Sequence, residues 1–97
     1  MELGRVREYE LVLILSPAAD EERNASVIGR LDSFITDRGG AMTKQEEWGM
    51  RRLAYPIQRF KEGNYYLRRF TLDGDHIREM ETHLGVSEDI LRHMIVK

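Results

Sequence analysis

A run of basic side chains in the middle of the chain carries the clearest chemical signal. Arg51 and Arg52 are adjacent, and six lysines or arginines stand between Arg51 and Arg69 against a single acid, Glu62. The whole chain has a formal net charge of −2, so this segment is a basic region on a slightly acidic protein. Guanidinium groups can bond two phosphate oxygens at once. The pattern predicts contact with an anionic partner such as nucleic acid, the alternative being an ordinary solvated surface.

The other reactive side chains form no pattern typical of catalysis. The chain has no cysteine, which excludes disulfides and thiolate metal sites and is compatible with a reducing cytosol. His76 and His83 are seven residues apart, whereas two ligands of one zinc ion on a helix stand nearer four apart. We therefore expect no enzyme activity, no cofactor and no metal site. One alternative is an acylphosphatase-like or small-ligand domain, because residues 4–7 faintly resemble the start of the acylphosphatase phosphate loop.

Length and composition are typical of a small globular protein. The 97 residues predict a single domain covering 1–97, and the chain is 41% hydrophobic and 33% charged. The longest apolar run, residues 11–15, is far shorter than the ~18 residues needed to cross a membrane. The polar start of the chain shows no signal-peptide pattern. We expect a cytoplasmic protein with no membrane partner.

Hydrophobic periodicity predicts four strands and two helices. The clearest helix has apolar residues at helical spacing, acids in its first turn and Gly39-Gly40 after its end. Gly49 inside the second strand predicts a bulge or a close approach of another backbone. A polar loop is expected over 58–64. The predicted strands span 9–15, 41–55, 65–72 and 90–97, and the predicted helices span 20–38 and about 77–85.

This element order is typical of the α+β, ferredoxin-like βαββαβ fold. Right-handed crossovers would place both helices on one face of a four-stranded antiparallel sheet. The first and third strands should be central, and the second should be an edge strand that carries Arg51 and Arg52. An exposed edge can pair with another chain, so a homodimerising module is a further alternative. The two helical regions are acidic, with five acids against two bases in 20–37 and six against one in 73–89.

Residues 46–57, with the sequence Glu-Glu-Trp-Gly-Met-Arg-Arg-Leu-Ala-Tyr-Pro-Ile, resemble the signature of the bacterial small-subunit ribosomal protein six family. Residues 9–14 resemble the first strand of that family, and residues 92–96 resemble its last. The resemblance covers nearly the whole chain. It implies a non-enzymatic ribosomal protein that binds the central domain of small-subunit ribosomal RNA together with small-subunit ribosomal protein eighteen.

The resemblance also implies that residues 51–56 lie at or near the surface that meets RNA and the partner protein. Pro56 could instead simply end the strand, and Tyr55 could cover the core. Arg68 and Arg69 depart from the family pattern, in which apolar or neutral residues are expected at these positions. The predicted RNA contacts are Arg51, Arg52, Arg59, Lys61, Arg68 and Arg69, and the predicted contacts with the partner protein are Trp48, Leu53, Ala54, Tyr55 and Pro56.

Overall fold

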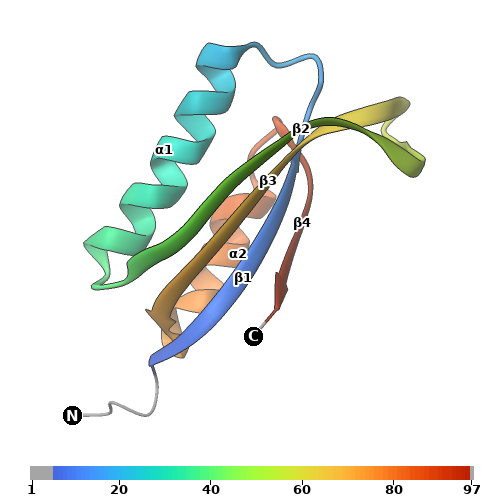
Figure 1. Ribbon diagram of the computed structural model, residues 1–97. Helices are drawn as coiled ribbons and strands as arrows, with labels where there is room; N and C mark the ends of the chain where they lie inside the picture. The colour runs from blue at the N-terminus through green and yellow to red at the C-terminus, as the bar shows by residue number, and fades with distance from the viewer. Residues whose placement is uncertain (1–5, 97) are drawn as a thin grey trace.

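The computed structural model describes residues 6–96 and has the predicted order of elements (Figure 1). Gly4 and Arg5, on which the acylphosphatase-like alternative depends, lie outside the described residues, as does Lys97 at the end of the predicted last strand. A short 3-10 turn, Gly74–His76, precedes the second helix. The elements are β1 (Val6–Leu15), α1 (Glu21–Asp37), β2 (Ala41–Ile57), β3 (Phe60–Asp73), α2 (Ile77–Gly85) and β4 (Ile90–Val96).

The four strands form one antiparallel sheet in the order β2-β3-β1-β4. β1 and β3 are therefore central and β2 is an edge strand, which confirms the ferredoxin-like topology that the element order predicts. α1 and α2 pack on the same face of the sheet, and within residues 6–96 no helix covers the other face (Figure 1). Neither helix of residues 6–96 has the length and hydrophobicity to cross a membrane.

The main core lies between the sheet and the two helices. Alternate residues of β1 point to this side, because side chains alternate between the two faces of a strand. They meet the apolar stripe of α1, whose members recur every three or four residues, and a shorter stripe of α2. The core residues include Tyr9, Leu11, Leu13 and Leu15 of β1, Val27, Leu31, Phe34 and Ile35 of α1, Phe70 of β3, and Met80 and Leu84 of α2.

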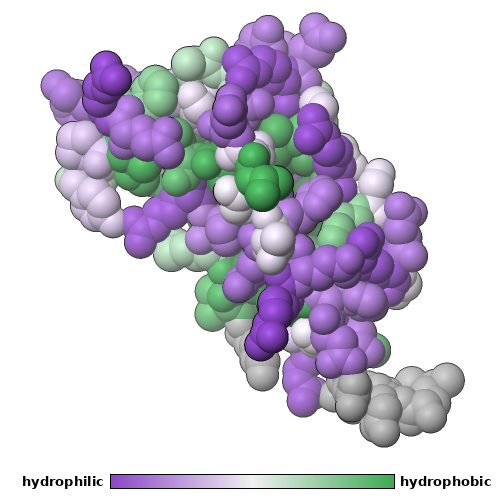
Figure 2. Space-filling view, turned by 180° about the vertical axis from the view of Figure 1, so that it is seen from behind, coloured by the Kyte–Doolittle hydropathy of each residue, from purple (hydrophilic) through white to green (hydrophobic). Residues whose placement is uncertain are grey.

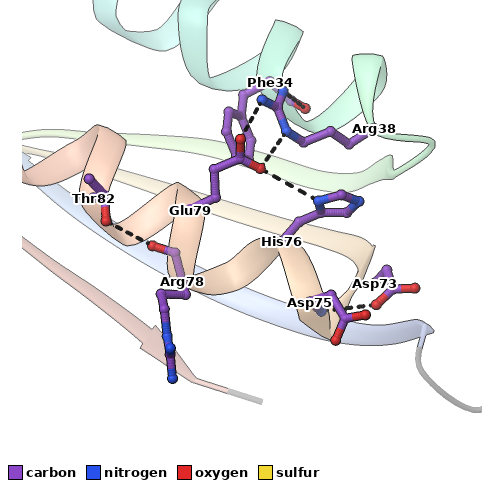
Figure 3. A network of polar contacts seen from close by, with 8 residues as sticks. All are labelled: Phe34, Arg38, Asp73, Asp75, His76, Arg78, Glu79 and Thr82. Atoms are coloured by element: carbon purple, nitrogen blue, oxygen red, sulfur yellow. Dashed lines mark hydrogen bonds and ion pairs between the residues drawn. The ribbon is translucent and has the colours of Figure 1, made fainter.

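The end of α1 is held to α2 by charged side chains (Figure 3). The guanidinium of Arg38 donates two hydrogen bonds of 3.0 Å to the carboxylate of Glu79 and lies 3.6 Å above the centre of the Phe34 ring. His76 stands 3.5 Å from the same carboxylate. At the other end of α1, the Asp20 carboxylate caps the helix by accepting a hydrogen bond from the Arg23 amide. Figure 2, seen from the side that α2 covers, shows a mostly hydrophilic surface.

A smaller apolar cluster forms on the face of the sheet that lacks helices. Ile14, Leu53 and Leu91 are buried there, and Ile57, Phe60 and Tyr65 pack around them. The β2–β3 hairpin reaches beyond the end of β1, whose last residue pairs with Asn64, and its tip bends in Figure 1. The cluster fixes the base of this overhanging hairpin on the sheet.

The prediction of a polar loop over 58–64 is wrong. β2 continues to Ile57 and β3 begins at Phe60, so the connection is the pair Gln58 and Arg59. Both residues have positive φ, 49° and 76°. Two such residues form a turn whose twist matches that of paired strands. The usual Asn-Gly signal of this turn is absent here, and the apolar side chain of Phe60 holds the start of β3 in place by packing in the smaller cluster.

Candidate RNA and protein interface

The candidate interface begins at a bulge in β2. The pairing register with β3 shifts between Glu47 and Gly49, and Gly49 has a φ of 80°. A residue with a side chain is strained at this φ, so the glycine permits the irregularity. This confirms the bulge predicted from Gly49. Trp48 is the extra residue of the bulge.

Trp48 lies in a stack of aromatic and cationic side chains. Its ring stacks on Tyr65 of β3, with ring centres 6.3 Å apart, and the Arg51 guanidinium lies 5.4 Å from the centre of the indole ring. The indole N–H donates a 2.9 Å hydrogen bond to Glu46, which is the main reason that the pKa of the Glu46 carboxyl is lowered. Trp48 is 39% exposed, so part of its ring faces solvent and it does not fill the core.

Arg51 and Arg52 are both exposed on the overhanging part of β2. They pair in register with Gly63 and Glu62 of β3, at consecutive positions. Their side chains therefore leave the strand on opposite faces, as predicted for a regular strand. Arg51 shares the face of Trp48, and Arg52 points to the other side of the hairpin. The pair can meet anionic groups on both sides of a projecting ribbon.

Residues 53–56 form a second irregularity in β2. Arg52 pairs with Glu62 and Ile57 pairs with Phe60, so the four residues between them have no partner in the pairing register. Leu53 turns inward into the smaller apolar cluster and is buried. Ala54, Tyr55 and Pro56 are exposed. All four residues were predicted to contact a partner protein; Leu53 packs beneath the segment, and the other three are exposed on it.

Arg92 of β4 joins this segment, which the sequence patterns did not predict. Its guanidinium donates a hydrogen bond to the Tyr55 hydroxyl and lies 5.8 Å from the centre of the same ring. The two residues are 37 positions apart, and only the pairing of β4 with β1 and the bend of the hairpin bring them together. Tyr55 is 56% exposed, so it does not cover the main core, and the contact with Arg92 holds its side chain in place.

The two remaining cations of the hairpin tip are exposed. Arg59 lies in the two-residue turn, and Lys61 lies on β3 instead of in the predicted loop. Within residues 6–96, neither of them forms an ion pair, nor do Arg51 and Arg52. These four cations are therefore available to an anionic partner.

Arg68 and Arg69, the other two predicted RNA contacts, differ from these four cations because both contact groups within the protein. Arg68 is only 3% exposed and points beneath α1, where its Nε lies 3.7 Å from Oδ1 of Asp32 and its Nη1 donates a 3.0 Å hydrogen bond to the carbonyl of Leu67. Arg69 points to the opposite face and donates a 2.6 Å hydrogen bond to the Glu10 carboxylate. The first side chain supports the fold, and the charge of the second is already neutralised. Both were predicted to contact RNA, and the structure places Arg68 in the interior and Arg69 in an ion pair with Glu10.

The family model described as ribosomal protein S6 matches residues 8–97. The small ribosomal subunit protein bS6 of Caldanaerobacter subterraneus subsp. tengcongensis is 40% identical over 92 residues, covering 95% of this chain and 97% of that protein. The bS6 protein of Fusobacterium nucleatum subsp. nucleatum is 36% identical, covering 95% and 98%. The crystal structure of 30S ribosomal protein S6 from Thermotoga maritima superposes with a TM-score of 0.88 at 34% identity, covering 94% of this chain and 86% of that one.

Proposed function

Because this chain belongs to the ribosomal protein S6 family, whose members are structural, non-enzymatic proteins of the small ribosomal subunit, we propose that its β2–β3 hairpin is the surface that binds RNA. The RNA is the central domain of small-subunit ribosomal RNA, and the protein partner is small-subunit ribosomal protein eighteen. The observation that carries the proposal is the set of four exposed cations on the hairpin that form no ion pair within residues 6–96: Arg51, Arg52, Arg59 and Lys61.

The arrangement supports positioning on a phosphate backbone more than recognition of base sequence. Arg51 and Arg52 project to opposite sides of the ribbon, so they can bind two different phosphate groups of a folded RNA. Arg59 and Lys61 extend the same charge to the tip of the hairpin. Each cation that neutralises a phosphate adds about one counterion to the salt dependence of binding.

The protein partner meets the neighbouring surface in this proposal. Tyr55 and Pro56 lie exposed on the irregular part of β2, and Trp48 presents a partly exposed ring beside the unpaired edge of the strand. Aromatic side chains and an open strand edge are both features through which proteins bind each other. The net charge of −2 makes RNA binding by this chain alone weak, so we expect the partner to contribute further positive charge.

The test is binding of the central-domain RNA fragment with and without the partner protein, over a range of salt concentrations. In the partner's presence, binding should appear and fall steeply with salt. The double variant Arg51→Glu and Arg52→Glu should weaken it strongly and reduce the slope of log K against log salt by about 2, one for each lost phosphate contact.

The matched control is Arg30→Glu with Arg78→Glu, which makes the same change in net charge at two exposed positions of the helices. This variant should keep a slope of log K against log salt close to that of the unchanged protein. Equal loss in both double variants would mean that only total charge matters, and the hairpin would then have no special role. Normal binding by the Arg51→Glu and Arg52→Glu variant would refute the proposal.

A further inference from the structure

A groove of about 740 Å³ runs between α1 and the β2 edge of the sheet. One wall is a single face of α1 from Glu21 to Asp32, and the other is the β2 bulge at Glu47–Gly49. Tyr66 and Asn64 of β3 complete the lining.

The lining of the groove is acidic. Three carboxylates line it, those of Glu21, Asp32 and Glu47, and within the described part of the chain no lysine or arginine does so. Asn24 also lines it, is only 5% exposed, and has no hydrogen-bond partner for its Oδ1 atom among residues 6–96. A buried carbonyl oxygen without a donor is unfavourable and uncommon in folded proteins.

Three of the oxygen-bearing side chains lie near one end of the groove. Glu47 pairs in register with Tyr66, so both lie on the helical side of the sheet, and Glu21 and Asn24 stand one turn apart on α1. Burial is the main cause that raises the pKa of Tyr66, and the charges of Glu47 and Glu21 raise it further, while the charge of Arg68 and the Asn24 side chain lower it. A primary ammonium group, with three N–H donors, matches three such acceptors.

A second acidic position lies farther along the same groove. Asp32 follows Asn24 by eight residues on one face of α1, a separation on the order of 12 Å along the helix axis. Its side chain is 36% exposed, so it faces solvent as well as Arg68 beneath it. Between the two positions the α1 wall consists of Ala25, Ile28 and Gly29, which offer no charge. The lining is polar at both ends and apolar in the middle.

We propose that this groove binds a linear aliphatic polyamine. One terminal ammonium meets Glu21, Asn24 and Glu47, the alkyl chain lies along Ala25 and Ile28, and a second ammonium reaches Asp32. A compact cation such as Mg²⁺ would gain nothing from the apolar middle, because it requires oxygen ligands in a tight octahedral arrangement. The inference is independent of the hairpin's role in RNA binding.

The experiment titrates isotope-labelled protein with spermidine and follows the nuclear magnetic resonance spectrum. The side-chain amide of Asn24 and the backbone amides of Gly29 and Gly49 should shift together as the groove fills. Calorimetry then gives the dissociation constant for spermidine. The exposed Glu47→Gln variant should bind about tenfold more weakly, since a hydrogen bond between charged groups contributes on this scale.

The control variant is Glu81→Gln, which removes one exposed acid from α2 outside the groove, and it should bind spermidine like the unchanged protein. Equal weakening in both variants would show general charge attraction and overturn the proposal. So would identical shifts with Mg²⁺, or the absence of shifts at Asn24. Binding of a lysine-containing peptide without binding of spermidine would assign the groove to a protein partner and likewise overturn it.

Discussion

The buried Arg68 gives a sharp prediction about folding stability. Its guanidinium lies beneath α1, where Nη1 donates a hydrogen bond to the Leu67 carbonyl and Nε lies 3.7 Å from Asp32 without a hydrogen-bond partner among the described residues. Replacing both members of a buried ion pair by apolar side chains is often neutral or stabilising, whereas removing one member of such a pair costs about 3–5 kcal/mol when the remaining charge is buried. The Asp32 side chain is 36% exposed and can be hydrated once Arg68 is gone, so we expect Arg68→Met to lower the free energy of unfolding by no more than about 1 kcal/mol. Arg68→Ala leaves a cavity and should destabilise by about 2–4 kcal/mol.

The acid dependence of the same pair provides a second readout. Burial is the main cause that raises the pKa of Asp32 above 3.8, and Arg68 opposes it through its charge and a hydrogen-bonding interaction. Arg68→Met removes both opposing effects, so the pKa of Asp32 should rise further. A raised carboxyl pKa favours the folded state below pH 3.8, and this contribution is lost as the pH rises through the raised value. The free energy of unfolding of Arg68→Met, taken relative to that of the unchanged protein, should therefore be highest at acidic pH.

Urea unfolding followed by circular dichroism, at several pH values, measures both effects. A carboxyl titration of Asp32 by nuclear magnetic resonance reports its pKa directly. If Arg68→Met lost as much stability as Arg68→Ala, the charge itself, and not the packing of the long side chain, would hold α1 on the sheet. Both variants should keep the salt dependence of RNA assembly, because a buried arginine neutralises no phosphate.

Two further predictions concern packing and a surface ion pair. A Cβ at Gly63 would overlap the side chain of Ile14, so Gly63→Ala should destabilise the protein by about 1–3 kcal/mol in urea unfolding. Gly29 lies at an open position of α1, so Gly29→Ala should stabilise the protein by roughly 0.5–1 kcal/mol in the same assay. The hydrogen bonds from Arg38 are the main cause that lowers the pKa of Glu79 below 4.5, so their stabilisation is present above pH 4.5 and is lost as the pH falls through the lowered pKa. Arg38→Gln should return the Glu79 pKa toward 4.5 in a carboxyl titration.

The sequence patterns predicted the fold well because each element has a strong local signal. The α1 stripe, its acidic first turn and the Gly39-Gly40 pair place a helix within one residue of its observed ends at each side. The β2 bulge was predictable from Gly49 for the same reason. The two-residue turn was missed because Gln58 and Arg59 carry no glycine, and what holds them is the tertiary packing of Phe60.

The candidate site was predicted less completely, since exposure depends on contacts between distant residues. No local signal separates Arg68 from Arg51: both are arginines on predicted strands. The difference is that Arg68 shares a face with Tyr66 and Phe70 and meets Asp32, 36 positions earlier. Knowing the strand register would have shown that Arg68 points into the helical layer. Likewise, the Tyr55–Arg92 contact joins two residues 37 positions apart, which spacing along the chain cannot indicate.

The distribution of charge explains how a slightly acidic protein could bind RNA in one orientation. The exposed, unpaired cations of the hairpin lie at the overhanging end of the sheet, whereas acids predominate in the helical regions, as in residues 73–89. In the proposed assembly, phosphate groups would be attracted to the hairpin and repelled by the helices. Arg68 is buried and Arg69 is paired with Glu10, so neither offers an accessible free cation to phosphate in the middle of the sheet, and this sharpens the contrast. The position of these cations would then set the orientation of the protein on RNA, even though the net charge of the protein disfavours RNA binding.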